Sequence, residues 1–339
     1  MTYDPSTSPC IGVVAIGRNE GARLEACLRS AVEHASAVVY VDSGSTDDSR
    51  AVARRLGAEV VELDLAIPFT AARARNAGFR RLLELYPGLE FVQFVDGDCE
   101  LRPDWLPQAA AALRDDPGLA VVCGRRRERR PEASVYNRLC DLEWDTPIGE
   151  ARACGGDALM RVAALAEAAG FDDRLIAGEE PELCVRLRRN GWRLRRLDVE
   201  MTLHDADLTR FKQWWRRSTR AGHAFAEGAA LHGAPPERHW VRETRSNWLW
   251  GLLLPAASLV AAPFTSGASL AVAAGLYALL AYRVRRHQLR RGRTRREAAL
   301  YAAFTTLGKF PQALGQCRYL WNRRRGKRSR LIEYKEVPA

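Results

Sequence analysis

The sequence lacks the glycine-rich loops through which many nucleotide-binding proteins hold phosphate groups. Neither a GxGxxG nor a GxxxxGK[ST] pattern follows any of the predicted strands. This absence argues against the dinucleotide-binding and P-loop classes. A nucleotide ligand would therefore need a different means of attachment.

The sequence also lacks any pairing or spacing of cysteines that is typical of a metal site. None of the eight cysteines forms a CxxC pair, and most lie in apolar or helical stretches, where cysteine behaves as a small hydrophobic residue. We expect reduced thiols in a cytosolic compartment. The first ten residues are polar and carry no signal-peptide pattern. The cysteines are Cys10, Cys27, Cys99, Cys123, Cys140, Cys154, Cys184 and Cys317.

Acidic residues are almost absent from residues 283–330, which contain sixteen Lys and Arg but only one acid, Glu297. The net charge of +11 arises in this segment, and the preceding chain is slightly acidic. Basicity confined to a tail does not predict nucleic acid as a partner. The polybasic run at 323–330 instead predicts attachment to membrane lipids that carry negative charge.

No charged residue occurs in residues 246–282, a 37-residue apolar stretch interrupted near its middle by PFTSG. One membrane span needs about 20 apolar residues, so the pattern predicts a hairpin of two short helices. Arginines on both sides place both flanks in the cytoplasm. A buried helical hairpin in a large soluble core is the alternative. Residues 298–321 are only moderately apolar and predict an interfacial or re-entrant segment.

The first two thirds of the chain alternate between strand-like and helix-like patterns. This alternation predicts an α/β fold, with a mostly parallel sheet and helices on both faces. In such sheets ligands bind at the carboxyl ends of the strands. Strands are expected near residues 10–19, 37–42, 58–64 and 89–96, with helices near 22–35, 49–56 and 70–86.

Polar loops follow three of the predicted strands. Arg18-Asn19-Glu20, Asp42-Ser43-Gly44 and Asp96-Gly97-Asp98 would meet at one edge of a parallel sheet. Asp and Gly favour turns, so a turn explains the third loop alone. Two carboxylates at this place also suit a hard cation, Mg²⁺ or Mn²⁺, which is often held by one or two carboxylates and the phosphates of a substrate.

Six sequence motifs follow one another along the first two thirds of the chain. They are VVAIGRNEG, VVYVDSGSTDDS, ARARNAGF, FVQFVDGDCEL, GGDALMRV and GFDDRLIAGEEPELCVRLRRNGW. In this order they resemble the motifs of family 2 glycosyltransferases with the GT-A fold, and the resemblance covers about residues 10–205. It implies transfer of a sugar from a nucleotide-diphosphate sugar, with inversion at the anomeric carbon and with Mg²⁺ or Mn²⁺ as cofactor.

The resemblance also implies roles for individual residues. Asp98 would be the direct metal ligand, with Asp96 beside it at the ribose, and His204 would be an additional metal or diphosphate ligand or simply structural. Loop capping is the alternative for Asp42 and Asp157. The remaining nucleotide-sugar-binding positions implied are Asn19, Glu20, Asp42, Arg75, Asn76, Gly155, Gly156 and Asp157.

An inverting displacement needs a carboxylate that takes the proton of the acceptor hydroxyl. The family usually has Glu-Asp here, whereas this chain has Glu179-Glu180-Pro181. Pro181 suits the first turn of a helix, which places Glu180 at the positive end of the helix dipole. Glu180 is the predicted base, with Glu179 as the second candidate.

These patterns predict three regions: a catalytic domain at 1–206, an amphipathic interface helix and linker at 207–240, and a membrane hairpin with a basic tail at 241–339. The catalytic domain would face the cytoplasm at the inner membrane. Its acceptor would be a lipid-linked glycan or an exopolysaccharide precursor. A nucleotidyltransferase with a related sheet and an inactive membrane scaffold of the same fold are the alternatives.

The Q-x-x-R-W signature of processive synthases is only partly present, since Arg217 occupies the Trp position.

Overall fold

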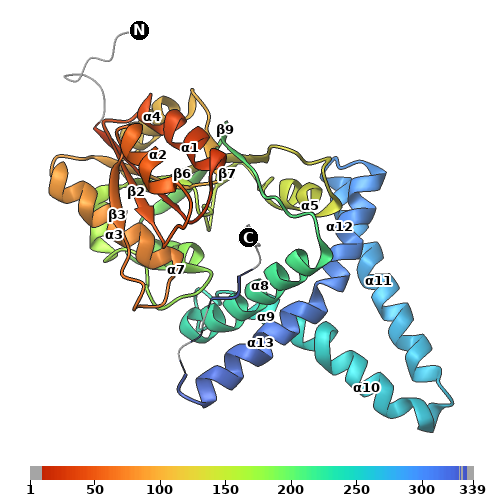
Figure 1. The fold of residues 1–339 in the computed structure, drawn as a ribbon. Coiled ribbons are helices and arrows are strands. Elements are labelled where there is room, and N and C mark those ends of the chain that lie inside the picture. Colours follow the sequence, from red (N-terminus) through yellow and green to blue (C-terminus); the bar gives the residue numbers. More distant parts are fainter. Residues whose placement is uncertain (1–9, 328, 330, 334–339) are drawn as a thin grey trace. The chain divides into compact units, whose positions relative to one another are not determined.

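A computed structural model describes residues 10–327, 329 and 331–333. These residues form two compact units, coloured along the chain in Figure 1. The first unit contains the chain up to Arg130 together with Glu143–Asp207. The second contains Pro131–Leu142 together with the chain from Leu208 onward. Residues 131–142 therefore belong to the second unit, although both neighbouring stretches of sequence belong to the first.

The first unit is built on a nine-stranded mixed sheet with the order β3-β2-β1-β4-β8-β6-β9-β5, in which β7 also pairs with β9. Strands β1 to β4 are parallel where they pair, whereas β8 is antiparallel to β4 and β6, and β5 and β7 are antiparallel to β9. The predicted α/β sheet is confirmed, and its second half is mixed. The strands are β1 (Ile11–Gly17), β2 (Ala37–Asp42), β3 (Glu59–Glu62), β4 (Phe91–Asp96), β5 (Cys99–Leu101), β6 (Leu119–Glu128), β7 (Gly149–Glu150), β8 (Ala158–Arg161) and β9 (Arg193–His204).

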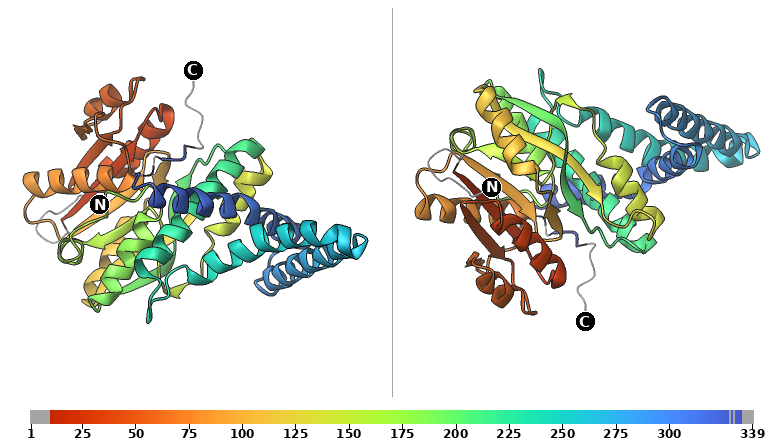
Figure 2. Two further views of the ribbon diagram at one scale, coloured as in Figure 1. Left: turned by 90° about the horizontal axis from the view of Figure 1, so that it is seen from below. Right: turned by 90° about the horizontal axis from the view of Figure 1, so that it is seen from above.

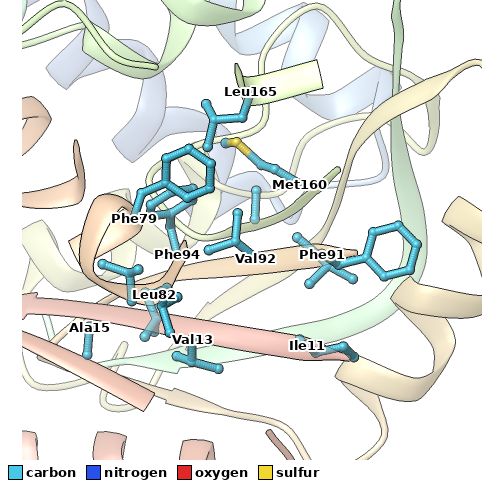
Figure 3. Close-up of a cluster of buried hydrophobic side chains, with 14 of the residues drawn as sticks. Ile11, Val13, Ala15, Phe79, Leu82, Phe91, Val92, Phe94, Met160 and Leu165 are labelled. Atoms are coloured by element: carbon cyan, nitrogen blue, oxygen red, sulfur yellow. The ribbon is translucent and has the colours of Figure 1, made fainter. Parts of the chain in front are cut away.

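Helices flank this sheet, and their buried faces form the core with the central strands. The side chains of β1 and β4 are almost completely buried, which explains their continuous apolar sequence. Figure 3 shows Phe79 and Leu82 of α3 close to Phe94 and other core residues of the strands. The helices are α1 (Ala22–Val32), α2 (Ser49–Arg55), α3 (Ala71–Leu85), α4 (Trp105–Asp115), α6 (Val162–Glu167) and α7 (Glu179–Arg189).

Helix α3 lies unusually close to the sheet at Gly78. A Cβ added there would lie 2.4 Å from Cγ1 of Val14 and 2.8 Å from Cγ2 of Val41. The start of α3 is capped by Thr70, whose hydroxyl accepts a hydrogen bond from the backbone of Arg73 at 3.1 Å. Close packing and the cap together fix the helix that carries Arg75 toward the strand ends.

The second unit is helical. Figure 2 shows α8 and α13 side by side, and they make extensive contact. Their backbones approach closely because each helix has a glycine at the contact: a Cβ on Gly222 or on Gly315 would lie 2.0 Å from a carbonyl oxygen of the other helix. The helices are α5 (Val135–Glu143), α8 (Phe211–His232), α9 (Val241–Trp248), α10 (Leu254–Ala261), α11 (Ala268–Arg290), α12 (Arg295–Leu307) and α13 (Lys309–Arg324).

Two segments of this unit are long and apolar enough to cross a membrane, Val241–Thr265 and Ala268–Arg290. The first consists of α9, a π-helical turn at Leu249–Leu253, α10 and a 3₁₀ turn at Ala262–Thr265. Only 6% of each apolar window is buried within the described chain. This exposure disagrees with the alternative of a hairpin enclosed in a soluble core, and it is weak evidence of membrane association.

Candidate active site

The three polar loops predicted from the sequence lie at the same edge of the sheet. In the parallel register Asp42 at the end of β2 pairs with Gly17, and Asp96 at the end of β4 pairs with Ile16. The carboxyl ends of β1, β2 and β4 therefore meet. This is the edge at which parallel α/β sheets bind their ligands.

Asn19 connects the loop after β1 to the loop after β2. Its backbone N–H donates to Oγ of Ser45 at 3.0 Å, and its side-chain Oδ1 accepts from the backbone of Thr46 at 2.7 Å. Asn19 has a φ of 55°, a left-handed conformation that Asn adopts more readily than most residues. Glu20, the next residue, pairs with Arg23 at 2.8 Å and lies against Gly97. Both side chains thus shape the rim of the site.

Asp42 is buried and makes local bonds. Its Oδ2 accepts from the backbone N–H groups of Gly44 and Ser45 at 3.0 and 2.9 Å, and its Oδ1 accepts from the hydroxyl of Tyr40 at 3.1 Å. These are the contacts of the loop cap that the sequence left open as an alternative. A nucleotide contact of Asp42 stays a prediction.

An acid–guanidinium cluster lies where β4 ends. Arg75 donates to Oδ1 of Asp96 at 2.8 Å, and Arg126 donates to Oδ2 of Asp96 at 2.9 Å. Arg126 also donates to Oδ2 of Asp157 at 2.8 Å, and Oδ1 of Asp157 accepts from the backbone of Asp96 at 3.1 Å. The hydroxyl of Thr202 also donates to Oδ2 of Asp157 at 2.9 Å. Five segments distant in sequence are joined in this way.

The electrostatics of the cluster keep its groups charged. Burial disfavours the charged form of Asp96, but the guanidinium groups of Arg75 and Arg126 outweigh burial and hold the pKa of Asp96 below its ordinary value. Burial likewise opposes the charge on Arg126, yet the carboxylates around it raise its pKa. Nε of Arg75 is buried and has no hydrogen-bond partner among the described residues. The cluster thus offers fixed charges of both signs to a ligand.

Asp98 lies next to His204, which ends β9. Oδ2 of Asp98 is 3.4 Å from Nε2 of His204, and Nδ1 of the same imidazole is 3.3 Å from Oε2 of Glu128. Burial lowers the pKa of His204, but Asp98 and Glu128 outweigh burial and raise it. All three side chains are buried.

This pair fits a divalent cation. Adjacent ligands of an octahedral ion with bonds of 2.0–2.1 Å are about 3 Å apart. Asp98 and His204 are close to that separation, and together with Cys99 they form one of the groups in the described chain that could hold a metal ion. Glu128 is 3.3 Å from Nδ1 on the other side of the imidazole, where it would hold the ring in the orientation that a metal ligand at Nε2 requires.

Gly156 lies against the acid–guanidinium cluster, because a Cβ there would lie 2.8 Å from Nη2 of Arg75 and 3.2 Å from Oδ2 of Asp96. Gly155 before it has a φ of 85°, which favours glycine. The side chain of Asn76, by contrast, bonds the loop before α7. Its Nδ2 donates to the backbone oxygen of Phe171 at 2.8 Å and to Oδ1 of Asp173 at 2.6 Å, and its Oδ1 accepts from the backbone N–H of Phe171 at 2.9 Å. The structure therefore brings Gly155 and Gly156 to the site, whereas Asn76 holds the loop before α7.

The two candidate bases at the start of α7 have different partners. Oε1 of Glu179 pairs with Arg75 at 2.6 Å. Oε1 of Glu180 accepts from the backbone N–H of Cys154 at 2.6 Å and from the thiols of Cys154 and Cys184 at 3.0 Å each. Glu179 is thus paired with the guanidinium of Arg75, whereas the donors that contact Glu180 among the described residues are neutral.

Sequence reasoning did not identify Arg126, Glu128, Trp144 or Thr202. Trp144 packs edge-on against the imidazole of His204, with ring centroids 4.5 Å apart, and Arg126 lies 5.1 Å from the centroid of its ring. The sequence feature that could have pointed to Arg126 is the basic run 125–130, which begins inside β6. The alternation of side chains along a strand divides these arginines between the two faces of the sheet. The fold is needed to tell which of them contacts Asp96.

Comparisons with known proteins find similarity to glycosyltransferases. Residues 13–161 match the model of the family described as Glycosyl transferase family 2. The chain is 27% identical over 172 residues to the pre-mycofactocin glycosyltransferase of Mycobacterium tuberculosis (strain ATCC 25618 / H37Rv), covering 48% of this chain and 35% of that protein. It is 28% identical over 211 residues to the succinoglycan biosynthesis protein ExoA of Rhizobium meliloti (strain 1021), covering 57% and 62%. The chain thus spans less than two thirds of the length of these curated relatives.

Among solved structures, the fold is similar to that of the mannosyltransferase PcManGT from Pyrobaculum calidifontis, in complex with GDP-Man and Mn²⁺. The TM-score is 0.64 at 20% sequence identity, and the match covers 95% of this chain and 90% of that one. At this identity the likeness shows the GT-A fold.

Proposed function

We propose that this chain, whose residues 13–161 match the model of glycosyl transferase family 2, transfers a sugar from a nucleotide-diphosphate sugar to an acceptor hydroxyl, with inversion at the anomeric carbon. The observation that carries the proposal is the convergence of Asp96, Asp98 and His204 with the guanidinium groups of Arg75, which is buried, and Arg126, which is partly exposed, at the strand ends. The family match favours glycosyl transfer over the nucleotidyltransferase alternative.

The charged cluster suits the diphosphate of a donor. Arginine N–H groups form strong hydrogen bonds to phosphate, and Nε of Arg75 has no partner among the described residues and could donate one. Asp98 and His204 would hold Mg²⁺ or Mn²⁺, with Asp96 beside them, and the cation would neutralise charge on the leaving diphosphate. Asn19 and Glu20 would line the nucleoside side of the site.

Glu180 is the better of the two candidate bases. Oε1 of Glu179 is engaged in an ion pair with Arg75 at 2.6 Å, which fixes the orientation of that carboxylate. The donors that contact Glu180 among the described residues are neutral and all bond Oε1, so Oε2 takes no part in these bonds. We infer that Oε2 of Glu180 accepts the proton of the acceptor hydroxyl.

The acceptor is a lipid-linked glycan or an exopolysaccharide precursor at the cytoplasmic face of the inner membrane. Two long apolar helices and the basic segment that follows them support attachment to a membrane, and a soluble acceptor would not require it. Equal turnover of a soluble acceptor with and without membranes would count against this part of the proposal.

The function is tested by the melting temperature of the purified protein with UDP, GDP, CDP or dTDP, each with and without Mn²⁺. At least one nucleotide should stabilise the protein in a Mn²⁺-dependent manner, because binding to the native state alone raises stability. Asp98→Asn should abolish this shift. Asp115→Asn, an exposed aspartate on α4, is the matched control and should retain it.

A protein that no nucleotide stabilises, or an Asp98→Asn variant that responds as the wild type does, would contradict the proposed donor site. The nucleotide identified in this way then defines the sugar donors to be assayed for transfer.

A further inference from the structure

Two cysteines and a glutamate far from each other in the sequence meet beside the proposed base. Cys154 lies in the loop between β7 and β8, whereas Glu180 and Cys184 lie one turn apart on α7. Their ligand atoms form one of the groups in the described chain that could hold a metal ion, separate from the group around Asp98 and His204. The sequence spacing of the cysteines gives no hint of this site.

We propose that Cys154, Cys184 and Glu180 form a binding site for a thiophilic divalent cation, of which Zn²⁺ is the physiological representative. Soft thiolate ligands favour such ions over Mg²⁺ or Mn²⁺, which prefer oxygen. The site is therefore chemically distinct from that of the donor cation.

The distance between the sulfurs fits tetrahedral coordination. With Zn–S bonds of about 2.3 Å and a tetrahedral angle, two thiolates are about 3.8 Å apart. The sulfurs of Cys154 and Cys184 are 3.7 Å apart. They need not move to bind the ion, whereas a disulfide would require them to approach to about 2.05 Å.

The carboxylate of Glu180 supplies the third ligand after a small adjustment. With a Zn–O bond of about 2.1 Å, the oxygen would be about 3.6 Å from each sulfur. Oε1 is 3.0 Å from both sulfurs in the structure, where the thiols donate hydrogen bonds to it. A withdrawal of about half an ångström is within the freedom of a glutamate side chain.

The surroundings leave room for a fourth ligand. Cys184 and Glu180 are buried, but Cys154 is only half-buried, so water can reach the ion from its side. Burial raises the pKa of Cys184 to about 11 and also raises that of Cys154, so both thiols are protonated in the free protein. Binding therefore replaces two S–H protons with two metal–sulfur bonds and releases both protons to solvent.

Occupancy would affect the proposed reaction, a consequence that rests on the proposed role of Glu180. A carboxylate bound to a cation is a poor proton acceptor. Zn²⁺ at this site would inhibit turnover while leaving the donor site intact. The binding itself does not depend on that role and is measured separately.

The test is a titration of the purified full chain with Cd²⁺, a Zn²⁺ analogue whose thiolate complexes absorb in the near ultraviolet. The wild type should show a thiolate band that saturates at one ion per chain and is displaced by Zn²⁺. The Cys154→Ser/Cys184→Ser variant should lose the band. Cys10→Ser, outside the cluster, and Asp98→Asn, in the donor-cation site, should both retain it.

A second measurement uses the wild type alone, so it does not depend on the folding of any variant. Zn²⁺ should slow alkylation of Cys154 by iodoacetamide at least tenfold and leave that of Cys10 unchanged, as read by peptide mass spectrometry. A wild type without the band, a band that survives in the double variant, or Cys154 alkylation unaffected by Zn²⁺ would overturn the site. Loss of nucleotide-dependent stabilisation with an intact band would instead contradict the proposed function alone.

Discussion

At the scale of single residues, Arg75 joins the end of β4 to the start of α7. One guanidinium nitrogen bonds Asp96 at 2.8 Å and another bonds Glu179 at 2.6 Å, while only 3% of the side chain is exposed. Removing one partner of a buried pair leaves an uncompensated charge. The two neighbouring glutamates of α7 should therefore respond differently to the same substitution.

Glu180→Gln should preserve the fold and nucleotide binding but reduce kcat by about 10²–10⁴-fold, because the amide oxygen can still accept hydrogen bonds but cannot take a proton. Glu179→Gln should instead lower the free energy of unfolding by about 3 kcal/mol, because it removes the charge that pairs with Arg75. Steady-state kinetics and denaturant unfolding of both variants check this prediction. A Glu180→Gln enzyme with full activity would assign the base elsewhere.

His204 predicts a pH dependence of stability in the presence of a chelator. Its folded-state pKa is raised above the unfolded value of about 6.5, because Asp98 and Glu128 outweigh burial. The charged imidazole therefore contributes stability that is fully present below pH about 6.5 and is lost as the pH rises through the folded-state pKa.

His204→Gln should accordingly be most destabilising at acidic pH, and the difference in melting temperature from the wild type should shrink as the pH rises above about 6.5. Melting curves of both proteins over this range provide the measurement. A difference that grows with pH would mean that the imidazole is buried in its neutral form.

Much of the candidate site could be predicted from the sequence, because Asp96, Asp98 and Asp157 stand in ordered motifs at strand ends. The contacts among these side chains could not be predicted from the sequence. Arg126 is one of several arginines in a basic run, and only the pairing of β6 with its neighbours places it at Asp96. Asn76 follows Arg75 in the same motif, but successive residues of a helix point in different directions, and its amide bonds Phe171 and Asp173. A nucleotide contact of Asn76 stays a prediction.

At the scale of elements, the contact between α3 and the sheet depends on the absence of a side chain at Gly78. Gly78→Val should lower the free energy of unfolding by about 3 kcal/mol, because its Cβ would overlap Val14 and Val41. Gly88→Val is the matched control, since nothing lies within 4 Å of a Cβ at that position. Urea unfolding measures both.

The overlap between a side chain at position 78 and the sheet can also be relieved by a smaller residue on β1. In the Gly78→Val background, Val14→Ala should restore part of the lost stability, although it is destabilising in the wild type. Purely additive effects of the two substitutions would show that the loss arises from helix propensity instead of from contact with β1.

The same scale explains which elements were predictable. The strands β1, β2 and β4 are buried on both faces and read as continuous apolar runs. The long strand β9 contains three arginines and alternates irregularly, and β5 and β7 are only two or three residues long. The mixed half of the sheet is therefore defined by tertiary pairing and not by local pattern.

At the scale of the whole molecule, the apolar helices α10 and α11 predict insertion into a membrane. Leu259→Arg combined with Val272→Arg should reduce the fraction of protein that stays with vesicles after an alkaline wash, because each central arginine costs about 2.5–3.5 kcal/mol on insertion. Both side chains are more than 60% exposed in the described chain, so packing is little affected. Leu65→Arg, at a 71% exposed leucine of the first unit, should leave the fraction unchanged. Equal retention of all three proteins would contradict a membrane role for the hairpin.

Helix α5 links the order of synthesis to the order of assembly. It is encoded between two stretches of the first unit, but Asn137 bonds the backbone of Leu208 at 2.9 Å and Tyr136 packs edge-on against Phe304, with ring centroids 5.7 Å apart. A ribosome therefore releases α5 more than 150 residues before the aromatic ring that covers Tyr136. No single cut in the polypeptide separates the units intact. A fragment ending at Asp207 would carry α5 without its partners, so removing residues 131–142 as well is the rational way to isolate the catalytic unit.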